Sequence, residues 1–132
     1  MNKKWLILPI AAIFDLLAMI LPVLLFPPVH WYDAPLFPVI RNAVEHVGRG
    51  QLVLLFTVGM ALGFLSRMRP AILGGVAISL LPLAAIAEMV VDSTSHNLFP
   101  LEFMVYAFYG GIVAIGVFIA RRIRSFIEGN GP

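Results

Sequence analysis

The chain has 132 residues, of which 61% are hydrophobic and 12% are charged, and its formal net charge is +2. A soluble domain averages about 25% charged residues, and so short a chain cannot bury this much apolar surface within itself. The composition therefore excludes an ordinary soluble protein and predicts an all-α integral membrane protein, with one domain over residues 1–132. The absence of cysteine excludes disulfides, thiolate catalysis and iron–sulfur clusters.

Residues 5–26 form the first predicted span, because about 20 apolar residues cross the hydrocarbon layer of a bilayer. We expect this span to be retained, since Asp15 interrupts it and Pro27-Pro28 stands where the cleavage site of a signal peptide would lie. Residues 38–47 then predict a short amphipathic helix in the membrane interface, between spans one and two. The polar side of that helix is expected to carry Arg41, Asn42, Glu45 and His46.

The remaining predicted spans cover residues 51–66, 72–91 and 101–120, which completes an antiparallel bundle of four helices. The second span contains Gly59-x-x-x-Gly63, a spacing that lets two helices approach closely in lipid. The third span contains Pro82, which predicts a kink, and Pro100 is expected to open the fourth.

The distribution of Lys and Arg predicts the orientation of the bundle. One side carries seven such residues: Lys3, Lys4, Arg67, Arg69, Arg121, Arg122 and Arg124. The other side carries only Arg41 and Arg49. By the positive-inside rule both termini are expected in the cytoplasm, and the short loops favour a multi-pass protein of the bacterial inner membrane. Because the cations flank apolar spans, they do not indicate nucleic-acid binding.

Asp15 is the most informative single residue, because it lies near the middle of the first span. An ionised carboxylate at that depth costs about 3 kcal/mol or more, so intramembrane acids are functional candidates. Small residues at Ala11 and Ala18 share its stripe, which predicts that Asp15 faces other helices. The polar groups that it could meet at this depth are Thr57, Ser79 and Tyr109. Asp15 either fixes the helix register as a protonated, hydrogen-bonded acid or handles a proton or cation.

A second group of polar residues gathers around the predicted outer ends of spans three and four. Glu88 and Asp92 share one helical face, His96 lies in the following turn, and Glu102 shares a stripe with Tyr106 and Tyr109. The group could form a cup, capped by Glu45 and His46 of the interfacial helix. Mixed carboxylate and imidazole ligands suit Zn²⁺ or Mn²⁺. The candidate ligands are Glu45, His46, Glu88, Asp92, His96 and Glu102. Ordinary roles in helix caps and turns explain the same residues equally simply.

Three functions stay open at this point. Short loops, small-residue packing faces and absent motifs favour a structural or accessory subunit of a membrane assembly, so its partners would be the lipid bilayer and other membrane subunits or further copies of the chain. A small transport protein would use Asp15 for a proton or cation, which the outer carboxylates gather. A membrane enzyme acting on a lipid or headgroup at the outer leaflet would use His96 together with Glu88 or Glu102 as acid and base. No cofactor is predicted beyond a divalent metal in the cup.

Overall fold

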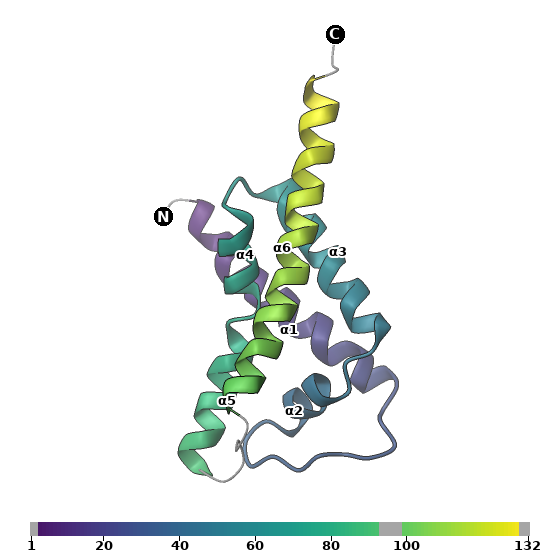
Figure 1. Ribbon diagram of the computed structural model, residues 1–132, viewed down its shortest axis with the longest axis vertical. Coiled ribbons are helices and arrows are strands. Elements are labelled where there is room, and N and C mark those ends of the chain that lie inside the picture. The colour runs from purple at the N-terminus through teal and green to yellow at the C-terminus, as the bar shows by residue number, and fades with distance from the viewer. Residues whose placement is uncertain (1–2, 93–98, 130–132) are drawn as a thin grey trace.

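The computed structural model describes residues 3–92 and 99–129, which contain helices and connecting segments without any strand (Figure 1). The six helices are α1 (Lys3–Leu25), α2 (Pro38–Glu45), α3 (Arg49–Leu65), α4 (Pro70–Ala77), α5 (Leu80–Val91) and α6 (Phe99–Gly129). α1 begins and α6 ends at the same end of the bundle, while α2 lies at the opposite end (Figure 1). These two ends are called the terminal end and the α2 end below.

The longest helix, α6, runs through the middle of the bundle between α3 and α4 (Figure 1). Its contact with α3 is made by the backbones themselves. A Cβ atom on Gly59 would lie 2.2 Å from the carbonyl oxygen of Val113, and one on Gly116 would lie 2.5 Å from that of Phe56. Only glycine allows this approach, so the Gly59-x-x-x-Gly63 spacing marks a helix interface here.

The contact between α4 and α6 has the same character. A Cβ atom on Gly74 would lie 2.4 Å from the carbonyl oxygen of Gly110. α6 is thus held on two sides by close backbone approaches, and its buried residues Val113 and Val117 belong to the apolar core. The central helix is therefore the least replaceable part of the bundle.

The predicted third span is a single stretch from Pro70 to Val91 by length and hydropathy, but its helix is broken. α4 ends at Ala77 and α5 begins at Leu80. Pro82 has no N–H to donate to the carbonyl of Ile78, and that carbonyl instead accepts the N–H of Leu81 at 3.0 Å. The break stands near the middle of the span, close to the kink that Pro82 predicts.

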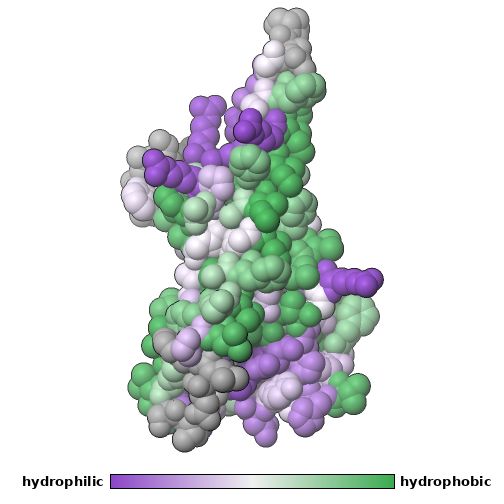
Figure 2. Space-filling view, viewed as in Figure 1, coloured by the Kyte–Doolittle hydropathy of each residue, from purple (hydrophilic) through white to green (hydrophobic). Residues whose placement is uncertain are grey.

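Within residues 3–92 and 99–129, three helical stretches are long and apolar enough to cross a membrane: Trp5–Leu25, Pro70–Val91 and Pro100–Gly129. A fourth span results if α2 and α3, which meet at 100°, count as one bent pair. On the face shown in Figure 2 hydrophobic residues cover the middle and hydrophilic residues gather at both ends. The chain is a helical, multi-pass membrane protein, as predicted.

Two helices end away from the predicted boundaries, and one predicted exposure is wrong. α6 continues past Ala120, where the predicted fourth span ends, to Gly129, beyond the other helices (Figure 1). The interfacial helix ends at Glu45, before residue 47. Asn42 does not face outward from that helix but is 0% exposed. Its side-chain amide accepts the N–H of Tyr32 and donates to the carbonyl of Tyr32, both at 2.9 Å, so it fastens the preceding loop to α2.

Candidate functional site

Asp15 lies inside the bundle, near the middle of α1, and is 0% exposed. Ala11 and Ala18, one turn on either side, are buried with it, as their stripe of small residues predicts. Neither carboxylate oxygen of Asp15 has a hydrogen-bond partner among the described residues. A buried polar atom without a partner is rare in folded proteins and calls for an explanation.

The three hydroxyl groups expected to meet Asp15 are used elsewhere, so that expectation is wrong for the described part of the chain. Thr57 is exposed, and its hydroxyl donates to the carbonyl of Val53 at 2.8 Å. Ser79 donates to the carbonyl of Val76 at 2.7 Å. Such bonds to the preceding helical turn are the common choice of Ser and Thr in helices. Tyr109 instead reaches α2, where its hydroxyl donates to the carbonyl of Val44 at 3.4 Å.

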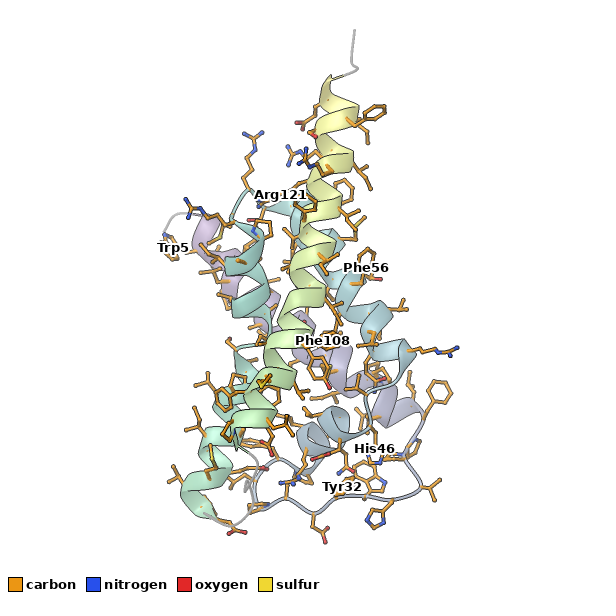
Figure 3. The ribbon with its side chains drawn as sticks, viewed as in Figure 1. Trp5, Tyr32, His46, Phe56, Phe108 and Arg121 are labelled. Atoms are coloured by element: carbon orange, nitrogen blue, oxygen red, sulfur yellow. The ribbon has the colours of Figure 1, made fainter. Side chains whose placement is uncertain are left out.

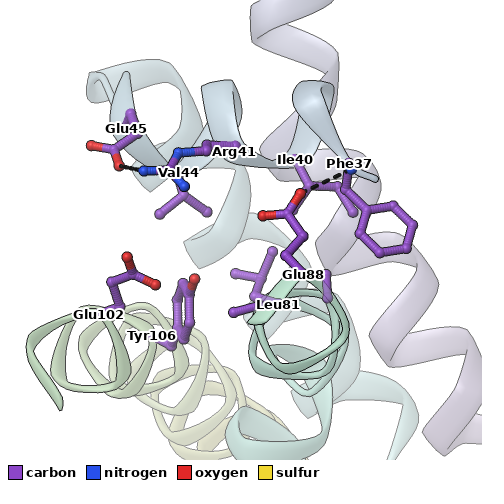
Figure 4. A pocket seen from close by; sticks show the side chains of 11 residues that line it. Phe37, Ile40, Arg41, Val44, Glu45, Leu81, Glu88, Glu102 and Tyr106 are labelled. Carbon is purple, nitrogen blue, oxygen red and sulfur yellow. Dashed lines mark hydrogen bonds and ion pairs between the residues drawn. The ribbon is translucent and has the colours of Figure 1, made fainter. Parts of the chain in front are cut away.

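The predicted cup of carboxylates is present in part, as a pocket between α2, α5 and α6 at the α2 end (Figure 4). We call it the acidic pocket, and its polar lining consists of Arg41, Glu45, Glu88, Glu102 and Tyr106. It encloses about 330 Å³ including its open mouth, and apolar side chains complete its walls. Three carboxylates against one guanidinium give it a negative character.

Glu88 is the buried member of the acidic pocket, with an exposed fraction of 3%. Its carboxylate accepts the backbone N–H of Phe37 at 2.9 Å (Figure 4). Phe37 is the N-cap residue of α2, where backbone N–H groups have no partner within the helix. A carboxylate is favourable at that position, because it opposes the positive end of the helix dipole. Glu88 therefore has a structural task, which joins α5 to the start of α2.

Glu45 and Glu102 line the pocket from different helices. Glu45 forms an ion pair with Arg41 at 3.8 Å, one turn earlier on α2, and its side chain is 39% exposed. Glu102 stands in the first turn of α6, next to Tyr106 in the close-up (Figure 4). The arrangement can attract cations to the mouth of the pocket.

Two other predicted ligands, Asp92 and His46, do not join them. Asp92 lines a separate, shallower pocket with Asp33 and Arg41. The ring of His46 lies 5.4 Å from that of Tyr32 on the loop side of α2, and both residues are labelled in Figure 3. His96 lies outside the described residues. In the ranges that the structure does describe, no three carboxylate or imidazole side chains come together closely enough to hold a metal ion.

A group of arginines at the terminal end was missed as a site. Arg67, Arg121 and Arg124 line a pocket of about 610 Å³ together with Gly63, Ser66, Ser125 and Glu128. We call it the basic pocket. By themselves, the sequence runs Arg67-Met68-Arg69 and Arg121-Arg122-Ile123-Arg124 predict only the orientation of the bundle. Their convergence depends on α3 and α6 lying against each other, which no spacing within either run reveals.

Comparison with protein-family models, curated proteins and solved structures finds no match to this chain. Its function is therefore to be inferred from the buried acid, the two pockets and the fold that holds them.

Proposed function

We propose that this small membrane protein handles a proton or a monovalent cation at Asp15. One observation carries the proposal: the carboxyl group is fully buried near the middle of a span, and no described residue donates a hydrogen bond to it. An ionised carboxylate in that place costs about 3 kcal/mol or more if nothing compensates it. A bound proton or cation removes this cost.

The broken span supports this proposal. α1 contacts both α4 and α5, whose junction at Ile78 and Ser79 stands about halfway along its span, as Asp15 does along α1. In small transport proteins, broken helices near the middle of the membrane supply backbone carbonyls that coordinate cations. A carboxylate on the neighbouring helix would complete such a coordination sphere.

The acidic pocket supports the same proposal from the α2 end. Glu45, Glu88 and Glu102 outnumber Arg41, so the pocket raises the local concentration of cations. A cation attracted there would still have to travel along the bundle to reach Asp15.

The test is ion flux through liposomes that contain the purified protein and an entrapped pH-sensitive dye. With an imposed membrane potential, the wild type is expected to conduct protons, or sodium or potassium in parallel assays with sensors for those ions. Asp15→Asn is expected to reduce the flux to that of empty liposomes while the variant elutes like the wild type. Thr57→Val is the matched control, because it removes an exposed intramembrane hydroxyl. Equal flux through Asp15→Asn and wild type would refute the role of Asp15.

A subunit of a larger membrane assembly is the second candidate, and the length of α6 favours it. Its 31 residues extend about 45 Å, whereas the hydrocarbon layer is about 30 Å thick. Phe126 and Ile127, near its projecting end, are 70% and 63% exposed. Those side chains would be covered in an assembly with another polypeptide.

Native mass spectrometry of the particle extracted gently from its membrane tests this second candidate. Additional polypeptides that disappear in the double variant Phe126→Ser, Ile127→Ser, and remain with the lipid-facing change Leu17→Ser, would support the assembly. A particle that contains this chain alone would oppose it.

A further inference from the structure

The basic pocket lies where α3 ends and α6 continues past it, at the terminal end of the bundle. Three of its lining residues are arginines and one is a glutamate, so its formal charge is +2. We propose that this pocket binds a phosphate group, with the headgroup of an anionic phospholipid as its preferred source.

Two of the arginines are already held in place by the fold. Arg121 donates through Nη2 to the carbonyls of Ser66 and Met68, just after the last turn of α3. Arg124 donates through Nη1 to the carbonyl of Phe64 at 3.1 Å. Carbonyls at the C-terminus of a helix have no partner within that helix, and the guanidinium groups supply one. The arginines are therefore fixed before any ligand arrives.

These hydrogen bonds do not use every donor of the two arginines, because each guanidinium group has five N–H donors. Nε of Arg121 is buried and has no acceptor among the described residues. Arg67 is exposed and makes no hydrogen bond or ion pair within the described ranges. Phosphate oxygens accept such donors in pairs, which is why arginine is common in phosphate sites.

One carboxylate opposes the proposal, and its effect is limited. Glu128 lines the pocket but accepts a hydrogen bond from Nε of Arg124 at 2.7 Å. Its charge thus acts mainly on Arg124 and to a lesser extent on Arg67, and the three arginines together still leave a net positive charge to attract an anion. Arg122 contributes nothing to the pocket, because its guanidinium lies over the ring of Phe118 at 5.2 Å.

The surroundings favour a lipid over free phosphate. Phe64 and Leu65, in the last turn of α3 between the lining residues Gly63 and Ser66, are 42% and 72% exposed and present apolar surface near the pocket. Gly63 closes the floor of the pocket, where α3 packs directly on α6: a Cβ atom there would lie 2.6 Å from the carbonyl oxygen of Val117. A headgroup phosphate among the arginines would place its acyl chains along this surface. The predicted cytoplasmic leaflet is also where anionic lipids attract basic residues.

The experiment is native mass spectrometry of the full chain in detergent with added lipid. Phosphatidylglycerol and phosphatidylcholine both carry a phosphate, but only the first is anionic. The wild type is expected to retain phosphatidylglycerol in preference. Arg67→Gln is expected to weaken that retention about fivefold, the usual effect of one basic residue at an anionic surface. Arg49→Gln, an exposed arginine at the other end of α3, is the matched control and should retain the lipid like the wild type.

A parallel titration with inorganic phosphate distinguishes the two sources of the group. If millimolar phosphate displaces phosphatidylglycerol from the wild type and not from Arg67→Gln, the pocket recognises the phosphate itself. If phosphate has no effect while the lipid preference persists, the pocket requires the lipid. Equal retention of both lipids with no binding of phosphate, or equal losses in Arg67→Gln and Arg49→Gln, would overturn the proposal. Since Arg67 makes no hydrogen bond or ion pair among the described residues, its variant is expected to stay folded.

Discussion

At the α2 end of the bundle, Glu88 accepts the backbone N–H of Phe37, at the start of α2. At the terminal end, Arg121 and Arg124 donate to carbonyls at the end of α3. In both places a buried or half-buried charge opposes the dipole of a neighbouring helix. The two ends therefore use charged side chains of opposite sign for the same structural purpose.

The two ends differ in which charged side chains are left over once the helix ends are capped. The acidic pocket is the smaller, about 330 Å³, and its most buried carboxylate is already bonded. The basic pocket measures about 610 Å³ and contains Arg67, which makes no hydrogen bond or ion pair among the described residues. The number of charged residues in a pocket therefore does not by itself indicate a binding site. Charged side chains that make no structural hydrogen bond or ion pair are the better indication.

The largest expected effect is the loss of stability when α3 and α6, on which both ends depend, are forced apart. Gly59→Val would place side-chain atoms where the backbone of Val113 lies, so we expect the protein to lose about 3 kcal/mol or more of stability. Thermal unfolding in detergent measures the loss. Gly111→Val is the control, because a Cβ atom there meets nothing within 4 Å. Similar unfolding temperatures for the two variants would show that the glycine contact is not what holds the bundle.

The next effect tests the structural task of Glu88. Glu88→Ala removes the charged acceptor of the Phe37 N–H, which is expected to cost about 2 kcal/mol. Glu88→Gln keeps an acceptor oxygen in the same place and should lose less. The unfolding temperatures of the two variants in detergent give the comparison. If alanine is tolerated as well as glutamine, the hydrogen bond does not stabilise this end.

A smaller effect separates the two kinds of arginine at the terminal end. Arg121→Gln removes donors from the carbonyls of Ser66 and Met68 and should cost about 1–2 kcal/mol. Arg67→Gln should leave the unfolding temperature nearly unchanged. Equal destabilisation by both changes would mean that Arg67 also stabilises the fold. The terminal end would then have no arginine without a structural role, and the difference between the two ends would disappear.

The smallest expected effect is a pH dependence near the end of α6. The hydrogen bond from Arg124 and the charge of Arg124, with a lesser contribution from Arg67, hold the pKa of Glu128 below its ordinary value of 4.5. The ionised glutamate therefore stabilises this end above its ordinary pKa, and the contribution disappears as the pH falls through the lowered value. The protection of the amides at 124–129 against hydrogen exchange, taken relative to the intrinsic exchange rate at each pH, should fall on acidification in the wild type. The same amides in Glu128→Gln should show no such additional change, and matching profiles would exclude the ion pair.

Much of the fold could be predicted because lipid imposes simple rules on sequence. Apolar runs of sufficient length marked the spans, and the Ala11 and Ala18 stripe placed Asp15 inside. The end of α6 could not be predicted from the same signal. Hydropathy falls after Ala120, but arginine is a good helix former, so the helix continues although the hydrocarbon has ended.

The candidate sites were less predictable, because each one joins segments that are distant in sequence. The helical pattern predicts that Asn42 is a surface residue. It is buried because the loop at Tyr32 covers α2 and forms hydrogen bonds with both the oxygen and the nitrogen of its side-chain amide. The hydroxyls of Thr57 and Ser79 stood at the right depth for Asp15, yet their own helices offered carbonyls closer by. Which acceptor a hydroxyl or amide contacts depends on the acceptors nearby, and residue spacing alone does not show which of them is favoured.

The shortness of α3 has a consequence for the membrane around the protein. Its 17 residues extend about 25 Å, less than the hydrocarbon thickness of a typical bilayer. A span that is too short is matched by local thinning of the bilayer or by long cationic side chains that reach outward to the headgroups. Arg49 and Arg67 flank α3 at its two ends. The protein should therefore partition into the thinner regions of a membrane and draw lipid headgroups inward along this one side.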